Sequence, residues 1–263
     1  MCRSPIRLKS DSKVFYVPCQ KCAWCLRNKR NEWFFRLSVE KKDHMFSRFI
    51  TLTYSDLNLP MSIDEESGVI LPVVSKIDVQ KFCKSIRNDG YKFRYMINSE
   101  YDKNGRPHYH GIIFSNEKID ITPYWTKGFS KSLPARDGSL KYVCKYMLKG
   151  SNVPEGAEPN FSLMSRRPGI GSSFVYKGEP YILGSNGVHI VPGHYYRRNY
   201  LASLNDKLRR SVSEQSIDYL SSTDPYNVLR SMQEKFAPDM DFDTWLQVSY
   251  NNDVKQQKKI NSK

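Results

Sequence analysis

The sequence lacks a long hydrophobic run. Nowhere in its 263 residues do about 18 consecutive apolar side chains occur, which is the length that a membrane-spanning helix needs. Residues 1–13 lack the apolar middle of a signal peptide, and a Gly-rich loop of the kind that holds nucleotide phosphates is also absent. We therefore expect a protein without a membrane span, located in the cytoplasm, with no nucleotide-binding loop of its own.

Acidic residues are few compared with basic ones. The chain has 27 Asp and Glu against 41 Lys and Arg, a formal net charge of +14, and residues 1–48 alone hold 12 Lys and Arg against 4 Asp and Glu. A surplus of this size indicates a polyanionic partner, most often nucleic acid. The 17 Tyr, 13 Phe and 4 Trp suit stacking on unpaired bases, although they equally suit an ordinary core.

Cysteine is sparse, but its residues are clustered. Cys19, Cys22 and Cys25 follow one another at two-residue gaps, and Cys2 stands near the N-terminus. In an intracellular chain such a cluster rarely forms disulfides, and four thiolates suit tetrahedral zinc. We expect these four cysteines to hold a structural Zn²⁺ that stabilises a short, charged segment without a core of its own. An iron–sulfur cluster, or no metal, stays open as an alternative.

The stretch around His108 and His110 is the most informative one. Gly105 and Pro107 predict a turn, and the apolar residues after His110 predict a strand that is buried on both faces. On a strand the two histidines point to one side and Tyr109 to the other. Two neutral imidazoles on one face are natural ligands for a divalent metal, although exposed or hydrogen-bonded histidines are the ordinary alternative.

A carboxylate is expected beside these histidines. Residues 92–100 predict the preceding strand, and the short polar loop 101–106 predicts that the two strands pair antiparallel. Glu100 would then lie close to His108. One carboxylate and two imidazoles form a hard, open site that suits Mg²⁺ or Mn²⁺ together with phosphate oxygens.

A second informative stretch is a predicted helix over residues 139–150 that Gly150 ends. Tyr142 and Tyr146 are four residues apart and share a face, with Lys145 beside them; the buried side would consist of Leu140, Val143 and Met147. A phenolate can attack a DNA phosphodiester and conserve its energy as a 5′-phosphotyrosine link, which a metal assists by polarising the phosphate. Packing or surface tyrosines are the ordinary alternative.

The remaining pattern predicts a strand over residues 49–54 and two further helices, over residues 26–42 and 76–88. The second helix would face the sheet with Ile77, Phe82 and Ile86. Residues 55–75 and 116–138 are predicted as loops. Cys144 is expected to pack inward.

Taken in order, these motifs resemble those of the HUH rolling-circle replication initiators. The resemblance rests on the strand Phe49–Tyr54, the stretch Gly105–His110 and the pair in Tyr142–Tyr146. The two-tyrosine form is similar to that of microviruses, the small single-stranded DNA bacteriophages. The cysteine run and the stretch Met164–Gly171 resemble the gokushovirus branch.

The resemblance covers roughly residues 14–175 and implies a metal-dependent endonuclease. Such an enzyme nicks one strand of the viral replicative form at an origin, keeps the 5′ end on a tyrosine, and later rejoins the strand. It implies metal ligation by His108 and His110, with Glu100 as our choice for the third ligand. It also implies Tyr142 and Tyr146 as nucleophiles, with the order of attack undecided, and Lys145 as a helper through its charge.

The resemblance also implies surroundings and partners. The expected location is the cytoplasm of a bacterial host, and the expected partner is DNA, as the replicative form and as the origin single strand. Host helicase and polymerase are candidate partners. Two alternatives stay open: a non-catalytic zinc-bearing DNA-binding protein, and a transposase or relaxase of the same superfamily.

The implied fold is α+β, a central antiparallel sheet of about five strands with helices on one face. We expect a cysteine-rich basic segment and helix over residues 1–47 and the endonuclease core over 48–150. A helical extension docked on that core would cover 151–263, with a disordered tail from 254. Within the extension, Arg166 and Arg167 are expected to hold DNA phosphate, although a structural turn is the alternative.

Overall fold

The chain divides into two compact units in a computed structural model. The core unit comprises residues 33–174, and the terminal unit comprises residues 1–32 and 175–263, so the division falls within one helix, α1. The structure describes residues 2–10, 13–146, 153–175, 182–183, 189–190, 193–204 and 225–261. No helix in these ranges is long and apolar enough to cross a membrane.

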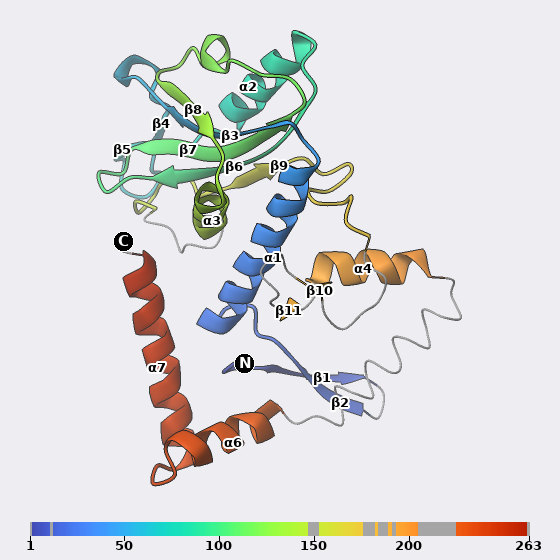
Figure 1. Cartoon of the computed structure of the whole chain (residues 1–263). Coiled ribbons are helices and arrows are strands. Elements are labelled where there is room, and N and C mark those ends of the chain that lie inside the picture. The colour runs from blue at the N-terminus through green and yellow to red at the C-terminus, as the bar shows by residue number, and fades with distance from the viewer. Residues whose placement is uncertain are drawn as a thin grey trace. The chain divides into compact units, whose positions relative to one another are not determined.

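The core unit is built on a five-stranded antiparallel sheet (Figure 1). Its strands are β3 (Phe46–Thr53), β6 (Phe93–Tyr101), β7 (Pro107–Ser115), β8 (Ser130–Pro134) and β9 (Ser162–Met164). They lie in the order β8-β3-β7-β6-β9, so β7 is central. The predicted α+β class with about five antiparallel strands is confirmed.

Helices cover both faces of this sheet, where one covered face was expected. Helix α2 (Lys76–Asn88) packs through Val79, Phe82 and Ile86 on the face that carries Tyr109 and Ile113. The other face carries Ile112 and Phe114 and packs against α1 (Ala23–Lys42) and α3 (Asp137–Tyr146), which contribute Leu37, Leu140 and Val143. The central strand is therefore apolar on both sides, because both sides are covered.

Gly111 allows the close approach of β6 and β7. It lies between His110 and Ile112, and a Cβ atom there would come within 2.6 Å of Met96 O and of Ile97 Cγ1. A larger residue would push the two strands apart at the place where they carry the candidate ligands, so the position requires glycine.

The start and the packing of α2 follow from its sequence. Ser75 caps the helix by accepting a hydrogen bond from the Asp78 backbone N–H, and Asp78 lies in the first turn, where the helix dipole favours a negative charge. Phe82 and Ile86 are buried as predicted. The prediction that Ile77 faces the sheet is wrong, because its side chain is 61% exposed.

Both predicted loops contain short elements. Residues 55–75 hold a 3₁₀ turn (η1, Asp56–Asn58) and the hairpin of β4 (Met61–Ile63) and β5 (Ile70–Pro72). Residues 116–138 hold η2 (Thr122–Tyr124) and the edge strand β8. The other edge strand, β9, comes from the stretch that the sequence assigned to the extension.

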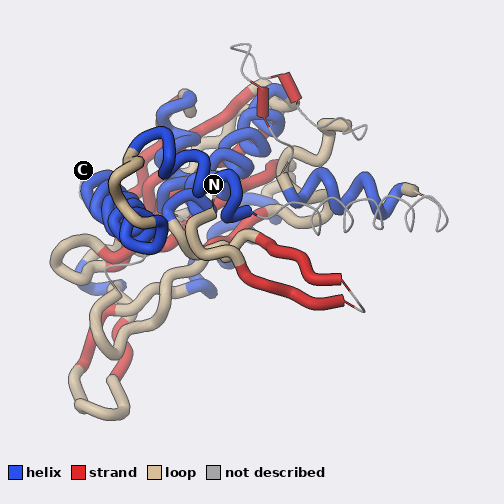
Figure 2. The backbone as a smooth tube through the Cα atoms, turned by 90° about the horizontal axis from the view of Figure 1, so that it is seen from below, coloured by secondary structure: helices blue, strands red, loops and turns tan. Residues whose placement is uncertain are grey.

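The terminal unit contains a two-stranded antiparallel ribbon of β1 (Ile6–Ser10) and β2 (Lys13–Val17), seen side by side in Figure 2. It also contains the pair β10 (Ile182–Leu183) and β11 (His189–Ile190), and the helices α4 (His194–Ser203), α6 (Pro225–Phe236) and α7 (Phe242–Asn261). Helix α7 continues to Asn261, whereas a disordered tail from residue 254 was expected.

Candidate functional site

Glu100, His108 and His110 lie together on one face of the sheet. β6 pairs with β7 so that Glu100 is directly opposite His108, and the pleat puts His110 on the same side. One ligand atom from each of the three residues lies within 4.8 Å of the others, and His108 Nε2 is 3.4 Å from Glu100 Oε2. This donor set fits a divalent ion such as Mg²⁺ or Mn²⁺, with positions left for water or phosphate oxygen.

Contacts at the other ring nitrogens orient both imidazoles. His110 Nδ1 is 3.1 Å from Thr51 Oγ1, which lies on the neighbouring strand β3 directly opposite His110. His108 Nδ1 is 3.4 Å from the Arg106 carbonyl oxygen. With Nδ1 engaged, Nε2 of each ring is directed toward an ion, as in metal sites whose outer contacts fix the ligands.

The environment keeps His110 neutral. Burial lowers the pKa of His110 to about 4, and the neighbouring His108 acts in the same direction, while Glu100 opposes them. At neutral pH the imidazole therefore carries the free lone pair that a metal ligand needs.

The Tyr142 ring lies beside these ligands. It meets the His110 ring edge-on at 5.3 Å between centroids. Phe49 stacks on His110 at 5.8 Å and meets Tyr142 edge-on at 5.7 Å, so three rings from β3, β7 and α3 form one cluster. Tyr142 is 38% exposed, so its phenol is accessible from solvent while its ring borders the metal ligands.

Asn98 connects the sheet to the tyrosine helix. It lies on β6 directly opposite His110, and its Nδ2 donates to the Val143 carbonyl oxygen of α3 at 2.8 Å. The side chain is 1% exposed, and its Oδ1 has no hydrogen-bond partner among the residues that the structure describes. The bond from Nδ2 holds α3 at the residue that follows Tyr142.

The other residues of the tyrosine motif are placed in part. Lys145 is half-buried on α3, and Cys144 is fully buried as expected. Tyr146 is the last residue of α3, and its side chain lies outside the described residues. Residues 147–150, including Met147, also lie outside them.

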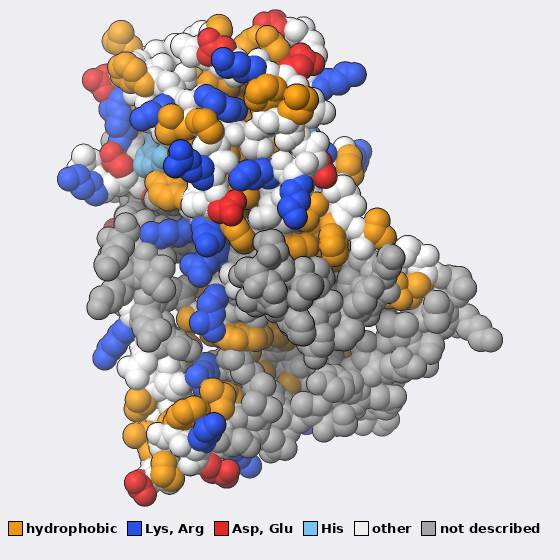
Figure 3. All heavy atoms as spheres, viewed as in Figure 1, with side chains coloured by type: hydrophobic (Ala, Val, Ile, Leu, Met, Phe, Trp, Pro, Cys, Tyr) orange, Lys and Arg blue, Asp and Glu red, His pale blue; other side chains and the backbone are white. Residues whose placement is uncertain are grey.

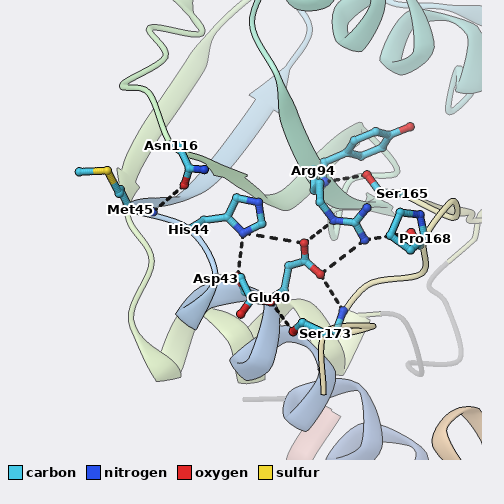
Figure 4. Close-up of polar contacts among 11 residues, drawn as sticks. Glu40, Asp43, His44, Met45, Arg94, Asn116, Ser165, Pro168 and Ser173 are labelled. Atoms are coloured by element: carbon cyan, nitrogen blue, oxygen red, sulfur yellow. Dashed lines mark hydrogen bonds and ion pairs between the residues drawn. The ribbon is translucent and has the colours of Figure 1, made fainter. Parts of the chain in front are cut away.

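A buried ion pair holds the segment after β9 against the core (Figure 4). The Glu40 carboxylate, 4% exposed, pairs with the Arg94 guanidinium and accepts a hydrogen bond from the Gly171 N–H at 2.7 Å. Arg94 also donates to the Pro168 carbonyl oxygen at 2.9 Å, and His44 Nδ1 is 2.9 Å from the Glu40 carbonyl oxygen.

Arg166 and Arg167 are exposed in this held segment. Tyr95 N–H donates to Ser165 Oγ at 3.1 Å just before them, and Arg36 donates to the Ile170 carbonyl oxygen at 2.9 Å just after them. The backbone is thus anchored on both sides of two guanidiniums that face solvent. Figure 3 shows further Lys and Arg side chains spread over the visible face of the core unit.

The four N-terminal cysteines come together in the terminal unit, as the sequence predicted. One sulfur atom from each of Cys2, Cys19, Cys22 and Cys25 lies within 4.8 Å of the others, and all four are free thiols. Burial raises the pKa of Cys19, but hydrogen bonds from the Lys21 and Cys22 backbone amides outweigh it and bring the pKa to about 7.

Two residues of the sheet site were missed by sequence reasoning. Thr51 was placed on the correct face of its strand, but its contact with His110 depends on the register between β3 and β7. Asn98 was placed on the face of Glu100, but its bond to α3 is a tertiary contact. Strand parity was the one signal available for either residue.

Comparison with known proteins places the sheet and the tyrosine helix in a family. Residues 47–151 match the family model for the replication-associated protein ORF2. This segment belongs to that family. The ORF2-family segment therefore contains the Glu100–His108–His110 triad and both tyrosines, Tyr142 and Tyr146.

Three relatives of the chain come from a virus and two phages. The chain is 30% identical to replication-associated protein ORF2 of Spiroplasma virus 4, over 53% of this chain and 50% of that one. It is 25% identical to replication-associated protein ORF4 of Chlamydia phage 1, over 82% and 58% of the two chains. It is 24% identical to replication-associated protein VP4 of Bdellovibrio phage phiMH2K, over 74% and 71%.

The chain spans between half and three fifths of the length of the first two relatives. Among solved structures, hypothetical protein ORF119 of Sulfolobus islandicus rod-shaped virus 1 is 19% identical, with a TM-score of 0.28, over 45% of this chain and 96% of that one. A similarity at that TM-score supports no conclusion, so the replication-associated relatives alone bear on function.

Proposed function

We propose that this chain starts rolling-circle replication of a single-stranded DNA phage by nicking one strand at an origin. The observation that carries the proposal is the position of the Tyr142 ring, 5.3 Å from the ring of His110 in a cluster of metal-binding side chains. The replication-associated proteins that match this chain support the biological setting.

The chemistry is a transfer of one phosphodiester bond. The Tyr142 oxygen attacks the scissile phosphorus, the bond from phosphorus to the 3′ oxygen breaks, and the 3′ oxygen takes up a proton and leaves as a hydroxyl. The 5′ phosphate stays on the tyrosine, and the free 3′ hydroxyl is a primer for synthesis. A divalent ion held by Glu100, His108 and His110 would polarise the phosphate and stabilise the charge that develops on its oxygens.

Tyr142 is proposed as the first nucleophile because its ring borders the triad. Tyr146, one helical turn further along α3, is proposed to make the second transfer while the first tyrosine is still esterified. Lys145, half-buried between them in sequence, is proposed to assist by its positive charge. Arg166 and Arg167, exposed in their anchored segment, are proposed to bind DNA phosphates.

The proposal is tested by adduct formation on denaturing gels. Oligonucleotides that tile the phage genome encoding this chain, labelled on the 3′ side of each candidate nick, are incubated with protein and Mg²⁺, Mn²⁺ or chelator. We expect a covalent protein–DNA band with either metal and none with chelator. Tyr142→Phe should lose the first adduct, and Tyr146→Phe should form it but fail to complete strand transfer.

The matched control is Tyr250→Phe, which removes a hydroxyl of similar exposure, 37% against 38%, from a helix of the terminal unit. It should leave the adduct unchanged. An adduct that survives the combined change of Tyr142 and Tyr146 to Phe would reject the assigned nucleophiles. Sequence-specific binding without nicking in any metal would favour a non-catalytic DNA-binding protein instead.

A further inference from the structure

The four cysteines lie outside the proposed nicking site and have no part in its chemistry. Cys2 precedes β1, Cys19 follows β2, Cys22 directly precedes α1, and Cys25 lies in the first turn of that helix. They therefore connect the two ends of the β1–β2 ribbon with the beginning of α1, within the terminal unit.

The spacing of their sulfur atoms fits one tetrahedral ion. Cys19 Sγ is 3.9 Å from Cys25 Sγ, and Cys22 Sγ is 3.9 Å from Cys2 Sγ. Four sulfurs at the usual zinc–sulfur distance of about 2.3 Å stand about 3.8 Å apart at the corners of a tetrahedron. A disulfide needs about 2.05 Å, and a multi-iron cluster would spread the cysteines further, because its own iron and sulfide atoms fill the centre.

The surroundings favour charged sulfur. The Cys22 N–H and the Lys21 N–H donate to Cys19 Sγ at 3.3 and 3.5 Å, and the Cys19 N–H donates to Cys2 Sγ at 3.3 Å. Such donors disperse the negative charge of metal-bound thiolates and fix their directions. Cys2, Cys22 and Cys25 are between 4% and 6% exposed, so water has little access to the centre of the group.

The ribbon has little else to stabilise it. It consists of two five-residue strands, and an isolated two-stranded hairpin is marginally stable in water. Ile6 and Leu8 of β1 are 47% and 41% exposed. Ile6 pairs with Val17, so the open end of the ribbon lies next to Cys2 and Cys19. An ion at that end would close the ribbon through metal–sulfur bonds.

We propose that Cys2, Cys19, Cys22 and Cys25 hold one structural Zn²⁺, which closes the base of the β1–β2 ribbon and anchors the start of α1. Four protein ligands leave no open position, which is the pattern of structural rather than catalytic zinc. Soft thiolates select zinc, whereas the carboxylate and imidazoles on the sheet suit Mg²⁺ or Mn²⁺. The chain would then carry two different metals with separate roles.

The first test is the metal content of the full-length chain, purified without a polyhistidine tag and measured by inductively coupled plasma mass spectrometry. We expect one zinc per chain. The combined variant His108→Ala and His110→Ala should keep that zinc, which separates it from any ion on the sheet. Cys19→Ser with Cys25→Ser should lose it, and Cys83→Ala, which changes a buried cysteine of the core unit, should keep it.

The second test asks whether the ion folds the ribbon. After zinc removal by a chelator, trypsin should cleave at the exposed Arg7 and Lys9 at least several-fold faster, and added zinc should restore protection. Cobalt substituted for zinc should give sulfur-to-metal charge-transfer absorption. Wild-type protein that contains iron in place of zinc, or no metal, overturns the proposal even if the cysteine variants fail to fold. Unchanged ribbon cleavage after zinc loss overturns the anchoring role.

Discussion

Single residues determine how the imidazoles on the sheet are presented. The Thr51 hydroxyl contacts His110 Nδ1 at 3.1 Å and so directs the opposite nitrogen toward an ion. Thr51→Val keeps the shape of the strand residue and removes this contact. We expect metal affinity to fall by about 10- to 100-fold, as for other outer contacts of metal ligands. The measurement is the Mn²⁺ concentration that gives half-maximal adduct formation.

Thr53→Val is the matched control for that change. Thr53 lies two residues along on the same face of β3, but its hydroxyl contacts the Phe129 carbonyl oxygen at 3.4 Å rather than a histidine. It should leave the Mn²⁺ requirement unchanged. Equal shifts in both variants would mean that loss of a strand hydroxyl, and not the orientation of His110, is responsible.

At the scale of elements, the buried pair of Glu40 and Arg94 joins α1, β6 and the segment after β9. Glu40→Ala leaves the Arg94 charge and the Gly171 N–H without their acceptor. Removing one partner of a buried pair destabilises by about 3–5 kcal/mol. We expect a fall of that size in the free energy of unfolding of the core unit, measured by urea denaturation.

The comparison for Glu40→Ala is an exposed ion pair. Lys41 lies 3.3 Å from Asp137, with side chains 35% and 72% exposed. Asp137→Asn should lower the free energy of unfolding by less than about 1 kcal/mol, because solvent screens such pairs. If the two variants unfold at the same urea concentration, the Glu40 network does not hold the segment in place.

At the scale of the whole molecule, the net charge of +14 governs the encounter with DNA. Each phosphate contact on a single strand contributes about 0.7 to the slope of log affinity against log salt concentration. The combined variant Arg166→Ala and Arg167→Ala should therefore reduce that slope by about 1.4. Fluorescence anisotropy with a dye-labelled single strand of arbitrary sequence, over a series of salt concentrations, measures it.

A control with the same change in charge separates position from total charge. Lys81 and Lys84 are exposed on α2, the helix that covers the other face of the sheet. Changing both to Ala should alter affinity slightly through the long-range field but leave the slope nearly unchanged. A matching loss of slope would show that the arginine pair makes no direct contact with phosphate.

Much of the core was predictable because its signals are local. The helix over residues 76–88 was predicted with its observed bounds, since a capping serine and a 3.6-residue apolar pattern define it. The antiparallel pairing of Glu100 with His108 followed from a short hairpin loop, which fixes the register between adjacent strands. The same local reasoning erred at Ile77, because periodicity does not say where the buried stripe of a helix ends.

The edge strands were not predictable in the same way. β8 and β9 are short and contain few β-branched residues, and β9 pairs with β6 across more than 60 residues of chain. Pairing at that separation depends on the finished sheet, so no local pattern announces it. The covering of both sheet faces, where one was expected, is likewise a property of the packed molecule.

By itself, the sequence determined the chemical groups and their faces: two histidines on one side of a strand, a carboxylate across the hairpin, two tyrosines on one helical face, and four cysteines near the N-terminus. Strand and helix periods are properties of the backbone, so spacing alone sets these directions. Only the tertiary structure decided that Phe49 and His110 border the Tyr142 ring, that Thr51 orients His110, and that Asn98 holds α3. These contacts join β3, β6, β7 and α3, and their distances exist only once the sheet has paired and the helix has packed on it.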